Sequence, residues 1–62
     1  MDIEKVKSAQ SRDEAYDYAI QWIHWVSEQS LSYGEMAEWN HVFEILAHRF
    51  DLVEEFIENG II

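Results

Sequence analysis

Three helix-start signals recur along the chain, each directly before a segment whose apolar residues repeat with the period of a helix. In each signal a residue that caps helices is followed three positions later by glutamate, at Ser11/Glu14, Ser32/Glu35 and Asp51/Glu54. The first side chain accepts a hydrogen bond from a free backbone N–H of the first turn, and the glutamate reaches back to the cap. Three such signals with matching periodicity predict three helices.

We expect these helices at Arg12–Gln29, Tyr33–Phe50 and Leu52–Asn59, with a shorter one within Asp2–Ala9. The chain has no proline, and Gly60 stands where a left-handed residue ends a helix, so that Ile61 folds back onto Phe56. The expected fold is all-α: a small bundle of three to four helices with short connections. Residues 1–62 form one acidic domain.

The first ten residues are expected to be a separate short element or to be frayed. If the helical phase of Arg12–Gln29 continued backwards, Ile3 and Val6 would fall on its acidic side. One long helix through this segment is therefore not expected.

The size of the chain makes association with another chain the expected source of extra stability. A domain of 62 residues buries only about 60% of its unfolded surface. The chain has no cysteine for a disulfide, and its histidines lack the spacing of a structural zinc site. More than half the circumference of the Arg12–Gln29 helix is apolar, which predicts a homodimer or larger oligomer through this helix.

The net charge of the chain limits the classes of partner that it can bind. Thirteen Asp and Glu residues stand against four Lys and Arg, and no Lys or Arg lies between Arg12 and Arg49. This balance repels nucleic acid and anionic membranes and favours a protein with a basic surface. No apolar run approaches the roughly 20 residues of a membrane span, and Met1–Glu4 does not resemble a signal peptide. A cytoplasmic location is expected.

The acidic residues are the first candidate binding site: Asp13, Asp17, Glu28, Glu54 and Glu58. Carboxylates four residues apart on a helix are separated by about 6 Å along its axis, a spacing comparable with that of neighbouring phosphates. A rigid acidic bundle of this kind suits the cationic groove of a nucleic-acid-binding protein. The alternative is that the charged faces only keep an aromatic-rich protein soluble.

A second candidate is the aromatic edge Tyr18, Trp22 and Trp25. Tryptophan and tyrosine dominate the energetics of many interfaces. The helical phase places Trp22 towards the core and leaves Tyr18 and Trp25 nearer an interface. The alternative is that all three belong to the core of one chain.

Metal binding and catalysis are not expected. Glu44/His48 and His24/Glu28 have a four-residue spacing that suits a shared ion, but a di-iron bundle needs Glu-x-x-His on two helices and only Glu38/His41 provides it. There is no cysteine nucleophile and no glycine-rich phosphate loop. No catalytic residues, metal or other cofactor are assigned.

Two functions remain open. The first is a non-enzymatic inhibitor that mimics nucleic acid, by analogy with small phage or mobile-element inhibitors of restriction and CRISPR systems. The second is a homo-oligomeric adaptor or assembly subunit that binds a partner helix through its apolar aromatic face.

Overall fold

The computed structural model describes residues 1–62 and contains four helices and no strands. They are α1 (Ile3–Lys7), α2 (Arg12–Val26), α3 (Tyr33–Phe50) and α4 (Val53–Glu58). The all-α prediction is confirmed, and so is the separate short helix near the N-terminus. None of the four helices has both the length and the apolar character needed to cross a bilayer.

Two of the predicted helix starts are confirmed in detail. The Ser11 hydroxyl accepts a hydrogen bond from the Glu14 N–H at 3.1 Å. At α3 the capping box is complete, because the Ser32 hydroxyl accepts from the Glu35 N–H and the Glu35 carboxylate accepts from the Ser32 N–H, both at 3.2 Å. Local hydrogen-bond chemistry thus fixes where the two long helices begin.

The third predicted start, at Asp51, is wrong. Asp51 ends α3 in the left-handed conformation, with φ 57° and ψ 50°, and α4 begins after Leu52 without a side-chain cap. The N–H groups of Asp51 and Leu52 both donate to the Ala47 carbonyl, which closes the end of α3. Aspartate suits this position because its short polar side chain tolerates the left-handed region better than most others.

The predicted end of the last helix is confirmed. Gly60 has φ 71°, the Ile61 N–H donates to the Phe56 carbonyl at 2.8 Å, and the Gly60 N–H donates to the Ile57 carbonyl at 3.1 Å. Phe56 and Ile61 are both buried, as this type of helix end requires. The other boundary differs: α2 stops at Val26 instead of Gln29, where the Ser27 hydroxyl donates to the His24 carbonyl at 2.8 Å.

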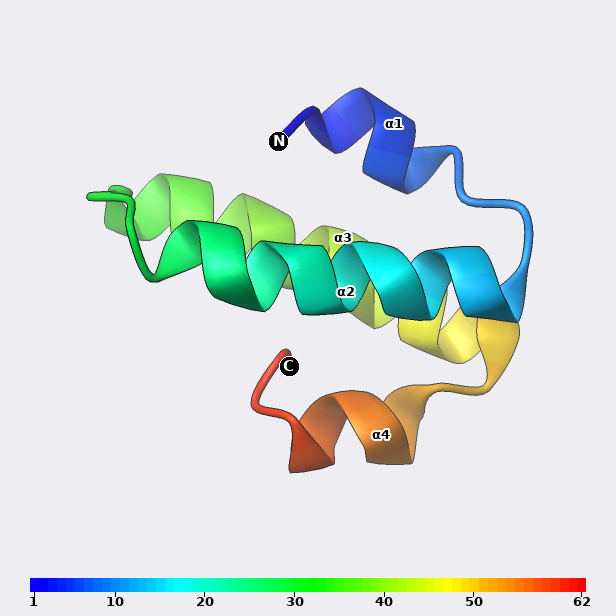
Figure 1. Ribbon diagram of the computed structural model, residues 1–62. Coiled ribbons are helices and arrows are strands. Elements are labelled where there is room, and N and C mark those ends of the chain that lie inside the picture. Colours follow the sequence, from blue (N-terminus) through cyan, green and yellow to red (C-terminus); the bar gives the residue numbers. More distant parts are fainter.

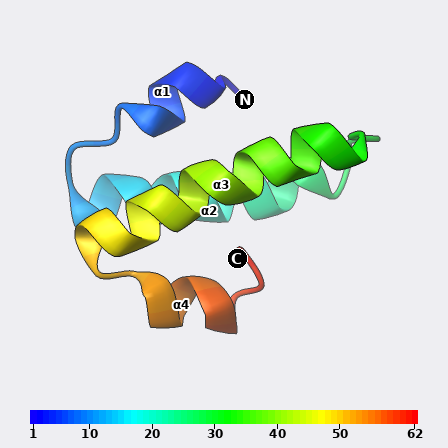
Figure 2. The same ribbon diagram turned by 180° about the vertical axis from the view of Figure 1, so that it is seen from behind.

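Helix α3 is the centre of the bundle. It runs beside α2 in the opposite direction, with α1 along one side of this pair and α4 along the other (Figure 1). Seen from behind, α3 lies in front and is flanked by α1 and α4 (Figure 2). Every other helix packs against α3, so its two long sides position the rest of the chain.

The core is built around Phe43, which is fully buried. Its ring lies 5.4 Å from that of Trp22 and 6.0 Å from those of Trp39 and Phe56, measured between centroids. These contacts join α2, α3 and α4 in one aromatic cluster. Val6 and Ala9 are also fully buried, so the N-terminal segment packs against the bundle.

Candidate protein-binding surfaces

The acidic residues form the largest charged feature of the surface. No charged side chain is buried. Only two ion pairs occur, Lys7 with Glu4 at 3.5 Å and Arg12 with Glu55 at 2.9 Å. Two of the thirteen carboxylates are therefore neutralised locally, and eleven have no cationic partner within the chain. Such a surface attracts cationic partners over distances of about 10 Å at moderate salt.

The five predicted acidic site residues are all exposed and lie on two helices and one turn. Asp13 and Asp17 are on the outward side of α2, where Asp17 accepts a hydrogen bond from the Gln21 amide at 2.8 Å. Glu28 follows the end of α2 and is distant from Asp13 along the helix axis. Glu54 and Glu58 lie on α4, on the side opposite the buried Phe56.

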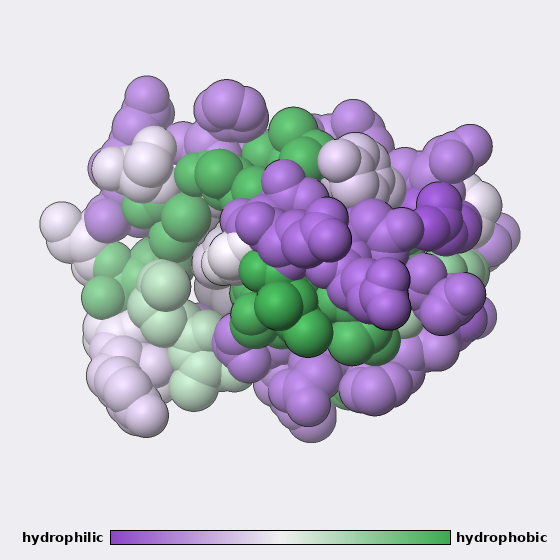
Figure 3. Space-filling view, turned by 90° about the horizontal axis from the view of Figure 1, so that it is seen from below, coloured by the Kyte–Doolittle hydropathy of each residue, from purple (hydrophilic) through white to green (hydrophobic).

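The ion pair between Arg12 and Glu55 brings the starts of α2 and α4 together, although these residues are 43 positions apart in the chain. A polar depression at this end is lined by Arg12, Asp51, Val53, Glu54 and Glu55. In Figure 3, which views the molecule from the α4 side, this end is on the right and is mostly hydrophilic. The first turns of α2 and α4, which carry Asp13 and Glu54, therefore lie at the same end of the molecule. We call the outward carboxylates of these two helices, Asp13, Asp17, Glu54 and Glu58, the acidic surface.

The predicted aromatic edge is largely used inside the single chain. Trp22 is only 6% exposed, as its helical phase indicates, and its indole N–H is buried without a hydrogen-bond partner. Trp25 is half-buried with its ring 5.7 Å from that of Trp39, and Tyr18 is half-buried against the core. These three residues therefore offer less free apolar area than their sequence pattern suggests.

The most exposed large apolar side chains lie mainly on α3 and α4. Tyr33 is 92% exposed, Ile57 58%, Ile45 52% and Met36 38%, whereas α2 contributes only Tyr16 to this group. Figure 3 shows hydrophobic patches between hydrophilic ones on the α4 side of the molecule. The excess apolar surface that was expected on α2 is thus found mostly elsewhere, because α2 packs most of its apolar residues against the core.

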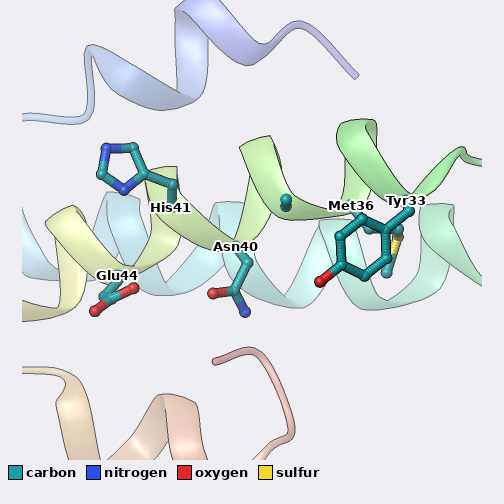
Figure 4. Close-up of a pocket in the computed structure, with 6 residues that line it drawn as sticks. Tyr33, Met36, Asn40, His41 and Glu44 are labelled. Carbon is teal, nitrogen blue, oxygen red and sulfur yellow. The ribbon is translucent and has the colours of Figure 1, made fainter.

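One long face of α3 is left open between α1 and α4. We call it the outer face of α3 and define it by Tyr33, Met36, Asn40, His41, Glu44 and Ile45, with Lys7 and Arg49 at its border with α1 and Ile57 at its border with α4. In Figure 4 His41 points towards α1, whereas Asn40 and Glu44 point towards the C-terminal segment. The Asn40 amide donates a long hydrogen bond of 3.4 Å to the Ile61 carbonyl. The two sides of this face therefore differ in chemistry.

Sequence reasoning missed Ile45 and Ile57. A signal for Ile45 existed, because it lies about 200° from Phe43 around the α3 axis and so points away from the core. The helical period places Ile57 on the apolar side of its helix with Val53 and Phe56. Its exposure could not be foreseen, because the apolar stripe of α4 is wider than the part that α3 covers.

The titratable residues form no candidate metal centre. No group of three or more His, Asp or Glu side chains converges in a geometry that could hold an ion. His41, Glu44 and His48 are all exposed on α3, and the first two point to different sides (Figure 4).

No protein-family model matches the chain, and no curated protein and no solved structure matches it either. The surfaces above are therefore interpreted from their own side chains and charges.

Proposed function

We propose that the protein is a non-enzymatic inhibitor that binds a partner with a cationic nucleic-acid-binding surface and competes there with nucleic acid. The observation that carries this proposal is the surface position of all thirteen carboxylates together with the pairing of only two of them. A partner with clustered lysine and arginine would supply the missing counter-charges. The expected class of target is a restriction or CRISPR-type nuclease in the cytoplasm.

The arrangement of the acidic surface supports mimicry of a phosphate backbone. Asp13 and Asp17 repeat along α2, and Glu54 and Glu58 repeat along α4, each pair with an axial rise of about 6 Å. The ion pair between Arg12 and Glu55 holds the first turns of α2 and α4 together, and these turns carry Asp13 and Glu54. Both helices are anchored by buried aromatic residues, so the carboxylates are carried on a fixed frame and lose little entropy on binding.

An adaptor that binds a partner helix remains the second candidate. The observation in its favour is the exposure of large apolar side chains, above all Ile45 and Ile57. An adaptor would bind through these side chains, and its acidic faces would serve only solubility.

The test compares two double charge reversals with the same net charge. Asp17→Lys/Glu58→Lys changes both rows of the acidic surface, whereas Glu4→Lys/Glu38→Lys changes α1 and α3. Each single substitution raises the net charge by two, so both double variants carry −5 in place of −9. We expect the first variant to lose the partner in a pull-down, because its two new lysines would repel the lysines of the partner. The second variant should retain the partner, because its acidic surface is unchanged.

The bound partner should also be released by duplex DNA at a concentration where simple salt of equal ionic strength releases nothing. Circular dichroism of both variants controls for folding. Equal binding of the partner by the two double variants would contradict mimicry and favour the adaptor. So would a partner that duplex DNA does not release.

A further inference from the structure

The outer face of α3 is an open surface with apolar side chains on both of its sides. Ile45 lies beside α1 and Ile57 lies on α4, and each exposes more than half of its surface. No other part of the chain covers this face, which points towards the viewer in Figure 2. Tyr33 and Met36 extend the apolar area towards the start of α3.

The two sides of the face carry different charges. The depression between α1 and α3 is lined by Val42, Leu46, Ile45 and His41 and by two cationic groups, Lys7 and Arg49. It therefore holds two of the four Lys and Arg residues of the chain. The Arg49 guanidinium lies 5.2 Å from the Phe50 ring and pairs with no carboxylate, whereas Lys7 pairs with Glu4 at 3.5 Å.

The depression between α3 and α4 is lined by Glu44, with Ile57, Val53 and Ile62 as its apolar part and Asn40 and His48 as its other polar groups. Both depressions lie at the same height along α3, because Ile45 lines the first and the adjacent Glu44 lines the second. The face is thus divided lengthwise into a basic apolar side and an apolar side that carries a carboxylate.

We propose that this face binds a second copy of the chain, with a twofold axis running parallel to α3. Rotation about this axis leaves every residue at the same height along α3. It brings the α1 side of one copy opposite the α4 side of the other. Ile45 of each copy then packs against Ile57 of the other, and Lys7 and Arg49 approach Glu44 of the other copy. The result is a closed interface in which the same patch is used twice.

Charge complementarity identifies the second copy as the occupant. The face concentrates the scarce positive charge of an otherwise acidic molecule, and each of its sides has its complement on the opposite side of an identical chain. The α2 part of the acidic surface, Asp13 and Asp17, is exposed on a helix that lies behind α3 in Figure 2, so it stays accessible. A domain of this size without disulfides also gains stability from such an assembly.

The same argument excludes a twofold axis perpendicular to α3. That rotation would place α1 of one copy against α1 of the other, so Lys7 and Arg49 would meet their own like charges. Ile45 would then approach the second Ile45, not Ile57. The two arrangements therefore bring different residues together.

Cysteine cross-linking separates the arrangements cleanly, because the natural chain has no cysteine. We expect a mixture of Ile45→Cys and Ile57→Cys chains to form mixed disulfides on oxidation, while each variant alone stays uncross-linked. Disulfide formation by Ile45→Cys with itself would overturn the proposed axis. If the wild-type protein sedimented as a monomer at every concentration up to the millimolar range, the proposed dimer would be wrong.

Charge exchange provides a second test that leaves the net charge unchanged. Arg49→Glu alone and Glu44→Arg alone should each weaken the dimer in sedimentation, because each places like charges across the interface. The double variant keeps the net charge of −9 and should recover dimerisation. If it dimerised no better than the single variants, the proposed pairing would be wrong. Neither substitution changes the acidic surface, so failure here would leave the proposed inhibitory function standing.

Discussion

Asp51 is the residue whose conformation is least expected from its chemistry. It has φ 57°, a value that costs L-residues other than glycine free energy, and it closes α3. Its carboxylate also stands at the negative end of the α3 dipole and forms no ion pair. Both effects oppose the native state.

Replacement of Asp51 should therefore stabilise the protein. We expect Asp51→Asn to raise the free energy of unfolding by a few tenths of a kcal/mol through loss of the charge, and Asp51→Gly to raise it by up to about 1 kcal/mol through relief of the backbone as well. Urea unfolding measures both. Gly60→Ala is the matched control at the other left-handed position and should destabilise by about 1 kcal/mol. A glycine variant less stable than the asparagine variant would show that φ at Asp51 carries no strain.

At the scale of elements, α3 is the helix with the most complete start. The Ser32 hydroxyl and the Glu35 carboxylate satisfy two backbone N–H groups that the first turn would otherwise leave free. Helix α4 has no such cap and depends on packing of Leu52 and Phe56. Because every other helix packs against α3, a change at its first turn affects the whole bundle.

Ser32→Ala should lower the free energy of unfolding by about 1 kcal/mol, the usual effect of removing a side-chain cap. Glu35→Gln should cost less, because its amide oxygen can still accept from the Ser32 N–H. Glu38→Ala is the control, since it is exposed, takes no part in the cap and should change stability by no more than about 0.5 kcal/mol. Thermal or urea unfolding followed by circular dichroism distinguishes the three. Equal losses from Ser32→Ala and Glu38→Ala would argue against the cap as a source of stability.

At the scale of the whole molecule, stability depends on a small core around Phe43. Its ring contacts Trp22, Trp39 and Phe56, so one side chain links three helices. The buried indole N–H of Trp22 has no acceptor, which reduces the gain from burying that ring. A core of this size rarely supplies more than about 3–5 kcal/mol.

Phe43→Ala should unfold the protein at room temperature, because such a truncation costs about 3–5 kcal/mol, as much as the domain has. Phe43→Leu keeps most of the apolar volume and should retain helical circular dichroism with a lower unfolding midpoint. A cooperatively folded alanine variant would mean that the core carries more stability than its size indicates.

The sequence by itself determined the helix starts at Ser11 and Ser32, the left-handed end at Gly60 and the buried position of Trp22. These features depend on hydrogen bonds within a few residues and on the helical period, both of which are local. It also indicated the acidity of the surface, because residue counts need no structure.

The tertiary structure alone decided the role of Asp51 and the exposure of Ile57. Aspartate is as suitable for a helix start as for a left-handed helix end, and only the packing of Leu52 against the bundle selected the second. Burial likewise depends on which helix covers which side. The contact between Arg12 of α2 and Glu55 of α4 spans 43 positions, and no local pattern indicates it.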